Sequence, residues 1–510
     1  MKRNMKKIFI TLLLAGGLFT SCDMDLQPHD TLDDQTAIQN INDCLKFRNG
    51  LYSSMRGLTA GSWINTQEIQ MDIFQGVIGN GNQVGTFANG NILSSDQTVE
   101  SMWSSIYSVI NSANYIIEKM ETLEGEYSEA QLMELKRYEG EARFVRAYCY
   151  YWLVDHFCQT YSADKGETAA LGLPLVTKYH PTSDRASYPS RSTQNETYAL
   201  IASDLDFALA ALQDYEAAGN APVANSHYLS SYAVLALQSR IALLKGEYTV
   251  ALSKAEAVIA GPYSLTSIDD YAKLWSNDEG TEVIFRPFMS ASELGSSTGG
   301  YFLSDNEESA WYIPTEDMLS LYDEENDVRF STFFTVYEGL QSNGLTLQAY
   351  VFNKYPGNES LKTGTQRNFV NMMKPFRLSE LYLIAAESAA AIGDAANVTK
   401  ANLYLNTLRA NRIVNYENVN LTASALTQGI RTERLKELIG EGFRLSDLRR
   451  WNIGFTRNGS YPRNPDVENI FVTSGKNMSY QAGDYRFIWP IPATEMQSNP
   501  QLAGQQNPGY

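Results

Sequence analysis

Residues 226–260 have the sequence SHYLSSYAVLALQSRIALLKGEYTVALSKAEAVIA, which indicates how the rest of the chain is built. From Val234 to Leu244 the apolar residues recur every three or four positions, the spacing of one face of an α-helix. Gly246 ends this helix, because glycine readily takes the left-handed conformation that follows many helix C-termini. A second periodic run fills the remainder of the stretch. The stretch therefore predicts two antiparallel helices joined by a short turn, a helical hairpin.

Residues 375–412 show the same arrangement. There Ala389-x-x-x-Gly393 repeats the spacing of Ala242-x-x-x-Gly246, and small residues at these positions let two helices pack closely. Both hairpins resemble tetratricopeptide-type repeats, although the strict tandem spacing of such repeats is missing. Two unrelated helical hairpins are the alternative. In either case the chain is expected to be mostly helical.

Two long segments, residues 57–97 and 261–370, lack a helical period and are predicted to be loop-rich insertions with a few short strands. They contain many Gly, Ser, Asn and Asp residues around short apolar stretches such as Val283-Ile284-Phe285. Irregular segments of this length in a compact protein are usually functional or disordered. Their aromatic residues argue against disorder, so a functional role is expected.

The first residues indicate export from the cytoplasm. Basic residues precede an apolar run from Ile8 to Phe19, which is shorter than the roughly 20 residues of a membrane-spanning helix and suits a signal peptide over residues 1–21. Thr20-Ser21-Cys22 resembles a bacterial lipobox, so Cys22 is the expected site of lipidation and the first residue of the mature domain, 22–510. Ordinary cleavage near an incidental Cys22 is the alternative. Acyl chains on Cys22 would anchor the protein to a membrane.

The composition argues against several classes of partner and cofactor. The chain has 40 basic and 58 acidic residues, a net charge of −18, and no basic run of the kind that neutralises nucleic-acid phosphates. Neither C-x-x-C nor H-E-x-x-H spacing occurs, so no metal or other cofactor is expected. Cys44, Cys149 and Cys158 are expected to be buried thiols rather than disulfide partners.

Five blocks of sequence follow the predicted signal peptide, and together they resemble the SusD/RagB family. Each block alone is moderately specific, but five in the family's order leave little room for chance. The blocks are Glu141-x-Arg143-Phe144-x-Arg146-Ala147-Tyr148 with Gly172-Leu173-Pro174-Leu175 downstream, Arg377-x-x-Glu380-x-x-Leu383-x-x-Ala386-Glu387, Leu405-Asn406-x-x-Arg409, Glu433-Arg434-x-x-Glu437-Leu438-x-x-Glu441-Gly442-x-Arg444-x-x-Asp447-Leu448-x-Arg450-Trp451, and Pro490-Ile491-Pro492-x-x-Glu495 with the closing Gln506-Asn507-Pro508-Gly509-Tyr510.

The resemblance implies a single large, mostly α domain of tetratricopeptide-like helical hairpins. It also implies a lipid-anchored protein, exposed on the cell surface at the outer membrane, that binds a nutrient and delivers it to a SusC-like TonB-dependent transporter. Asp23 and Asp25 after Cys22 are similar to the export signal of Bacteroidetes lipoproteins. The family serves glycans most often, and some members, including the RagB type, are associated with peptides. We therefore expect a glycan ligand, with an oligopeptide as the alternative.

Charged residues of the fourth block are expected to form a structural ion network rather than an active site. Three glutamates fall four residues apart, and like charges on one helical stripe are destabilising unless cations approach them. The cations expected to approach are Arg409, Arg444 or Arg450. The residues assigned to the network are Glu433, Arg434, Glu437, Glu441 and Arg444.

Sugar binding needs flat apolar rings together with side chains that bond hydroxyl groups. The two insertions supply both, and family members present ligand-binding aromatic residues from these regions, although no motif fixes their positions. The ligand-binding candidates are Trp63, Asn82, Phe87, Asn91, Tyr301, Phe302, Trp311 and Tyr312. Trp103 and Trp152 lie in helical stripes and are expected in the core.

An enzyme is not expected, because no nucleophile elbow, P-loop, dinucleotide fingerprint or zinc-protease helix occurs. A glycoside hydrolase could nevertheless place its two carboxylates without any local signature. A helical adaptor that binds only proteins would also suit the hairpins. Such an adaptor would not need aromatic-rich insertions.

Overall fold

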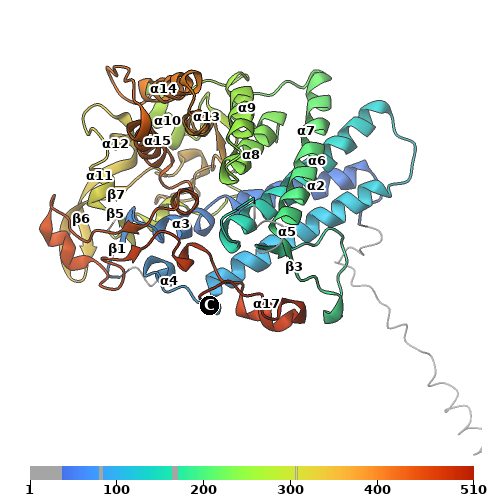
Figure 1. Ribbon diagram of the computed structural model, residues 1–510, viewed down its shortest axis with the longest axis horizontal. Coiled ribbons are helices and arrows are strands. Elements are labelled where there is room, and N and C mark those ends of the chain that lie inside the picture. The colour runs from blue at the N-terminus through green and yellow to red at the C-terminus, as the bar shows by residue number, and fades with distance from the viewer. Residues whose placement is uncertain (1–36, 80–83, 164–169, 305, 307) are drawn as a thin grey trace, which may run out of the picture.

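The computed structural model describes residues 37–79, 84–163, 170–304, 306 and 308–510. Within these residues the chain is mostly helical, as predicted (Figure 1). The predicted signal peptide, Cys22 and Asn82 lie outside the described residues. The longer helices are α2 (Ile41–Leu58), α5 (Gln97–Glu121), α6 (Glu129–Phe157), α7 (Gln194–Ala217), α8 (Ser231–Leu244), α9 (Tyr248–Ile259), α13 (Leu378–Ile392), α14 (Ala395–Ala410) and α15 (Ala423–Leu438).

Both predicted hairpins are confirmed, the first as α8 with α9 and the second as α13 with α14. Gly246 and Gly393 lie in the two turns with φ angles of 72° and 80°. In this left-handed conformation a Cβ atom would be strained, which explains why both turns use glycine. The local sequence therefore determines where these helices end.

The insertion 261–370 interrupts the helical array in sequence but not in space. Helix α9 packs directly against α13, and α15 also packs on α13. Before them α5, α6, α7 and α8 pack one on the next along the chain. Figure 1 shows α8, α9, α13 and α14 together at the top, while β6, β7, α11 and α12 of the insertion extend to the left. The array is the tetratricopeptide-like fold that the hairpins predicted.

Buried arginine–carboxylate pairs connect helices of this array that are distant in sequence. Each pair is bidentate, and an ion pair buried in this way costs several kcal/mol when only one partner is removed. The pairs include Arg48 of α2 with Glu141 of α6, Arg146 of α6 with Asp204 of α7, and Arg240 of α8 with Glu380 of α13. Charged residues of the first two sequence blocks thus have structural roles.

The insertions contain more regular secondary structure than the sequence predicted. Their helices span only four to eight residues, too few turns to show a helical period. Strands β6 and β7 form an antiparallel hairpin. The elements are α3 (Ser62–Ile69), β1 (Phe74–Gly76) and α4 (Gly85–Ala88) in the first insertion, and α10 (Tyr271–Ser276), β4 (Val283–Phe285), β5 (Tyr312–Pro314), α11 (Glu316–Leu319), α12 (Val328–Phe333), β6 (Phe334–Ser342) and β7 (Leu345–Phe352) in the second.

The remaining elements are short and close the molecule around the array. Strands pair two by two and antiparallel throughout the described ranges. In the closing block, Asn507 donates hydrogen bonds to the carbonyl oxygens of Phe157 and Trp489 at 2.8 and 2.7 Å, so the C-terminal tail is packed onto α6. These elements are β2 (Leu171–Pro174) with β3 (Arg191–Thr193), β8 (Phe376–Arg377) paired with β4, α16 (Arg444–Arg450), β9 (Phe455–Thr456) with β10 (Ser479–Tyr480), and α17 (Ala493–Ser498).

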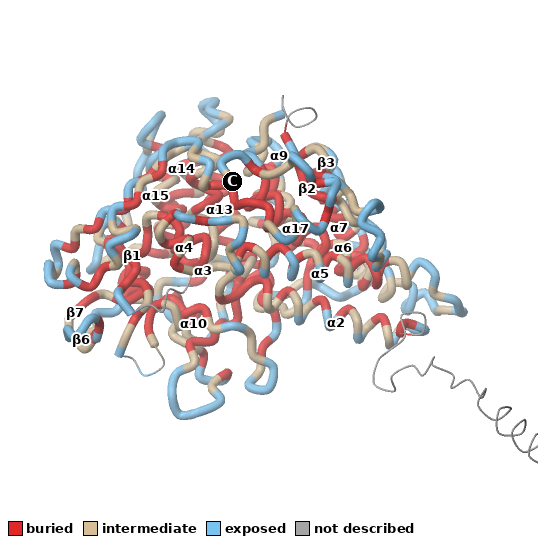
Figure 2. The backbone as a smooth tube through the Cα atoms, turned by 90° about the horizontal axis from the view of Figure 1, so that it is seen from below, coloured by how far each residue is buried: buried red, intermediate tan, exposed pale blue. Residues whose placement is uncertain are grey.

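Two large apolar cores stabilise the chain, and Figure 2 shows buried segments in both the helical and the strand-containing regions. The helical core includes Trp103 and Trp152, as predicted. The other core is made largely of insertion residues such as Phe302 and Phe352.

Cys44, Cys149 and Cys158 are buried free thiols. No helix within the described ranges combines the length and the apolar character needed to cross a membrane.

Candidate ligand-binding site

The two insertions that carry the predicted ligand residues meet in space. Strand β1 of the first pairs with β5 of the second, with Gln75 opposite Ile313 and Gly76 opposite Tyr312. The pairing continues one residue further, where the Val77 N–H donates to the carbonyl oxygen of a candidate residue, Trp311, at 2.9 Å. Segments more than 200 positions apart are therefore held in fixed register.

A second connection holds the first turn of α3 against the segment before Tyr301. The Gly61 N–H donates to the Thr298 hydroxyl at 2.9 Å, and the Asn65 amide donates to the Thr298 carbonyl oxygen at 2.9 Å. Gly61 has a φ of 60°, and a Cβ at this position would lie 2.7 Å from the Cβ of Ser296. Glycine is therefore required both by the backbone conformation and by the close approach of the two segments.

Trp63 and Tyr301 line one open cavity of about 340 Å³, which we call the Trp63–Tyr301 cavity. Both rings are partly exposed. Trp311 does not line the cavity, but its ring packs edge-on against Tyr301 with centroids 5.1 Å apart. On the other side, the Trp63 ring packs edge-on against buried Trp152 at 5.0 Å. Each cavity ring is thus held in place by a neighbouring tryptophan.

Hydroxyl groups from the start of α5 form the polar side of this cavity. Thr98, Ser101 and Ser105 occupy one helical face in steps of three and four residues, and Ser62 and Gln97 add another hydroxyl and an amide. Asp96 caps α5 by accepting the Thr98 N–H at 2.8 Å, which fixes where this helix begins. These residues are not among those predicted from the sequence, although the helical spacing of the three hydroxyl residues is visible there.

The described residues that line the cavity carry no charge. Burial raises the pKa of the Tyr301 phenol, so that its hydroxyl remains neutral near pH 7. Behind Trp63, the Trp152 ring stacks on His156 with centroids 4.0 Å apart. Burial lowers the pKa of His156 to about 4, so this stack is neutral as well. The site can bond hydroxyl and amide groups and contact apolar ring faces.

The other ligand-binding candidates lie in different environments. Asn91 is exposed, and Trp311 is partly exposed. Phe87, Phe302 and Tyr312 are fully buried in the two cores and present no surface to a ligand. Phe87 packs against Trp489, and Phe302 packs against Phe74. Asn82 lies outside the described residues.

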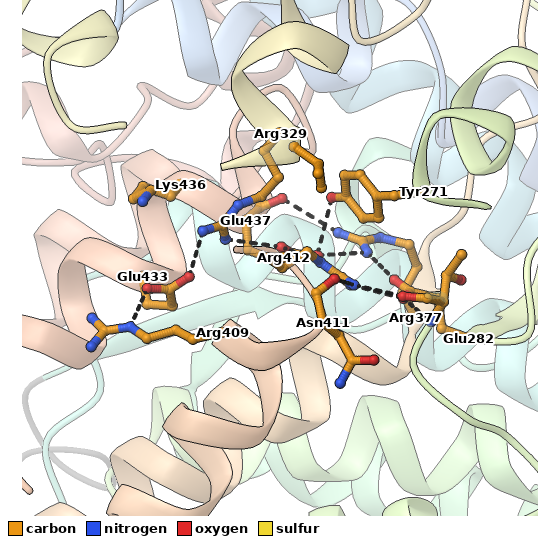
Figure 3. A network of polar contacts seen from close by, with 12 residues as sticks. Tyr271, Glu282, Arg329, Arg377, Arg409, Asn411, Arg412, Glu433, Lys436 and Glu437 are labelled. Carbon is orange, nitrogen blue, oxygen red and sulfur yellow. Dashed lines mark hydrogen bonds and ion pairs between the residues drawn. The ribbon is translucent and has the colours of Figure 1, made fainter. Parts of the chain in front are cut away.

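The glutamates assigned to the ion network pair with arginines, as Figure 3 shows for Glu433 and Glu437. Glu433 and Glu437 are also buried. Glu437 accepts from Arg412 at 3.0 Å, from Arg377 at 3.1 Å and from Arg329 at 3.1 Å. Burial opposes ionisation of Glu437, but the three guanidinium charges outweigh it and hold its pKa well below the usual value. A carboxylate enclosed in this way has no access to a substrate.

The network differs from the prediction in its partners. Helix α15 ends at Leu438, so Glu441 lies in the following turn, where it binds Lys354 and Arg377 at 2.6 Å each. Arg409 binds Glu433, as expected. Arg444 instead binds Asp72, and Arg434 and Arg450 bind Asp447, so these three arginines form ion pairs apart from the three glutamates.

Within the described ranges, no three His, Cys, Asp or Glu side chains are grouped as metal ligands. In the buried charged network, Glu282 and Glu437 already accept hydrogen bonds from arginine side chains. The arrangement of the Trp63–Tyr301 cavity therefore has to be understood from its rings, hydroxyls and amide alone.

Comparison with known proteins gives two family matches that do not overlap. The model described as "SusD family" matches residues 331–510, and the model described as "Starch-binding associating with outer membrane" matches residues 25–243. A SusD-like protein of Formosa agariphila is 24% identical over 462 residues, covering 81% of this chain and 80% of the relative.

Solved structures are similar over almost the whole length of both chains. A SusD superfamily protein from Bacteroides thetaiotaomicron has a TM-score of 0.77 and 29% identity, with 92% of this chain and 100% of that chain covered. A laminarin-binding SusD-like protein has a TM-score of 0.68 and 21% identity, with 93% and 100% covered. The helical array and the insertions are thus both part of a shared fold.

Proposed function

The chain belongs to the SusD family, and from this premise we propose that it is a nutrient-binding protein of the cell surface that captures a glycan in the Trp63–Tyr301 cavity. The observation that carries the proposal is the convergence of two aromatic rings, four hydroxyl side chains and an amide on one uncharged cavity. The description of the matching family as starch-binding and associated with the outer membrane supports a glycan ligand and this location.

The cavity suits a neutral sugar for a physical reason. A pyranose has an apolar face, which packs on an aromatic ring, and hydroxyl groups at its edge, which both donate and accept hydrogen bonds. Trp63 and Tyr301 offer the rings, and the α5 hydroxyls offer partners that also donate and accept. A cavity of about 340 Å³ holds one or two sugar residues, and its open form lets a longer chain extend beyond it.

The proposed role is binding of the glycan without a covalent reaction. Hydrolysis of a glycosidic bond commonly needs two carboxylates on either side of the bond. Neither Asp nor Glu is found among the described residues that line the cavity. In the proposed cycle the protein, anchored by lipid at Cys22, binds the glycan and delivers it to a SusC-like TonB-dependent transporter, which uses energy from the inner membrane for uptake.

The experiment is a binding screen with the purified mature protein. Soluble starch, laminarin, xylan and pectin are tested by affinity electrophoresis and titration calorimetry, and each mixture is then analysed for released sugars. We expect binding of at least one glycan and no product release. Steady release of oligosaccharides would contradict the proposal, and binding only of a mixed peptide digest would replace the glycan with a peptide ligand.

Anchoring and delivery are tested in the native membrane. Mass spectrometry of the mature N-terminus is expected to find acylated Cys22, and purification under mild detergent is expected to recover a TonB-dependent transporter in stoichiometric amount. An unmodified Cys22 together with a protein recovered alone would overturn this part of the proposal while leaving glycan binding intact.

A further inference from the structure

A second cavity, of about 260 Å³, lies between α11, α15 and α16. It shares no lining residue with the Trp63–Tyr301 cavity. The two cavities lie near opposite ends of α3, since Trp63 is in the first turn of this helix, whereas Asp72 and Ile73 of the second cavity follow its last residue. The second cavity is therefore a separate site rather than an extension of the first.

Arg431 lines this cavity with its hydrogen-bonding groups unused. Its guanidinium lies over the Trp451 ring, 5.0 Å from the centroid, but makes no hydrogen bond or ion pair with any other residue that the structure describes. Trp451 is itself fixed, because its indole N–H donates to Glu387 at 2.6 Å. Arg431 is thus held in position by stacking while its N–H donors remain available, in contrast to the paired arginines of the ion network.

Asp317, on α11, lines the same cavity and is likewise without a hydrogen bond or ion pair to the described residues. Asp72 and Arg444 also line the cavity and form a bidentate ion pair with each other at 2.8 and 2.6 Å. The charged side chains of the cavity are therefore two carboxylates and two guanidiniums, whose charges cancel. The cavity offers an unused acceptor and an unused donor over an apolar floor that includes Met318, Leu435 and Leu448.

We propose that this cavity, named here the Arg431–Asp317 cavity, is a second carbohydrate site that holds one neutral sugar residue. A guanidinium only donates hydrogen bonds and a carboxylate only accepts them. A sugar hydroxyl does both, so a pyranose can accept from Arg431 and donate to Asp317 while its apolar face covers the floor. The volume of about 260 Å³ matches a single sugar residue better than a longer segment.

A neutral ligand fits better than an anion on electrostatic grounds. An anionic ligand would gain from Arg431 but would be repelled by Asp317, while Asp72 and Arg444 neutralise each other, and the chain as a whole has a net charge of −18. Two sites on one protein would also raise the apparent affinity for a long glycan, because binding at the second site becomes intramolecular. The second site thus extends the proposed function but is tested independently of it.

The test uses saturation-transfer NMR on the mature protein with the methyl glycosides of glucose, galactose, mannose and xylose as probes. The background variant is Trp63→Ala/Tyr301→Ala, which removes the rings of the first cavity. We expect at least one neutral probe to give saturation transfer in this background. We also expect Arg431→Gln/Asp317→Asn, added to it, to weaken that signal at least fivefold.

The matched control is Lys178→Gln/Asp269→Asn, which removes one cation and one anion from exposed positions outside both cavities and is expected to leave the signal unchanged. Equal thermal unfolding of all variants shows that they are folded. The proposal is overturned if no neutral probe binds, if Arg431→Gln/Asp317→Asn has no effect, or if methyl glucuronide binds where the neutral probes do not. Loss of glycan binding in Trp63→Ala/Tyr301→Ala alone concerns only the first cavity.

Discussion

The carboxylate of Glu68 accepts the backbone N–H of Gly442 at 2.9 Å, although the two residues are 374 positions apart. The same carboxylate accepts the N–H groups of Gly440, Phe443 and Arg444. Glu68 lies on α3, the helix that carries Trp63, so these bonds connect this helix to the turn that follows α15. The position of α3, and with it Trp63, thus depends on a segment more than 370 positions away in the chain.

Replacement of Glu68 by glutamine is expected to lower the free energy of unfolding by about 1–3 kcal/mol, because the buried N–H groups would lose acceptors. Urea denaturation of Glu68→Gln measures this. Glu417→Gln, at an exposed position, is the control and should change stability by less than about 0.5 kcal/mol. Equal stability of both variants would show that the bonds to Glu68 do not hold α3.

Trp63→Ala and Tyr301→Ala are each expected to weaken affinity for the glycan found in the screen about tenfold, which corresponds to about 1.4 kcal/mol. Each substitution removes a ring from the cavity without opening the core, since both rings are partly exposed. Titration calorimetry gives the change. Phe288→Ala, which removes an exposed ring outside the cavity, is expected to bind normally. Unchanged affinity in both cavity variants would remove the site assignment.

Gly299→Ala is expected to weaken glycan binding, although residue 299 does not line the cavity. Gly299 begins the short turn that carries Tyr301, and an added Cβ would collide with the carbonyl oxygen of Tyr355. Because this oxygen belongs to the backbone, the turn must move, and the Tyr301 ring moves with it. Gly364→Ala has no atom within 4 Å of the new Cβ and is the control. A Gly299→Ala protein with wild-type affinity would show that the ring position is not critical.

Glu437→Gln is expected to lower the free energy of unfolding by about 3–5 kcal/mol, because it leaves three buried guanidiniums partly uncompensated. Thermal and urea unfolding measure the loss. The control Glu338→Gln changes an exposed carboxylate in β6 and should have little effect. If the two variants were equally stable, the network would not contribute to the architecture as we infer.

Acid is expected to destabilise the protein through the same network. Burial opposes ionisation of Glu433, but Arg329 and Arg409 outweigh it and lower its pKa, and Arg377 and Lys354 do the same for Glu441. Below about pH 4.5 the unfolded chain binds protons at these carboxyls while the folded chain binds fewer. The stabilisation is therefore complete above that pH and is lost as the pH falls through the lowered pKa values.

Urea denaturation between pH 3 and 6 checks this dependence. The free energy of unfolding should fall steeply below about pH 4.5 in the wild type. Glu433→Gln removes one of the carboxyls and is expected to give a shallower slope at a lower overall stability. A wild-type stability that stays constant or rises as the pH drops would contradict the assignment.

The helical hairpins were predictable because helix formation depends on neighbours in sequence. The apolar period of residues 226–260 determines which residues of that segment form helices. The glycines at 246 and 393 determine where the neighbouring helices end, and the structure has its helices and turns at these positions. The insertions were predicted as segments without a helical period. Their internal helices could not be predicted, since one or two turns give no periodic signal.

The sequence by itself thus determined the helical class, the family blocks and the two regions that supply the aromatic rings of the Trp63–Tyr301 cavity. Only the tertiary structure decided that Trp63 and Tyr301 share a cavity whereas Phe87, Phe302 and Tyr312 are buried, and that Glu437 meets Arg329 and Arg377. The physical reason is the separation in sequence over which each interaction acts. Caps and periodicity act between adjacent turns, but the exposure of a ring and the partner of a buried charge depend on segments that are far apart in the sequence and meet only when both cores have packed.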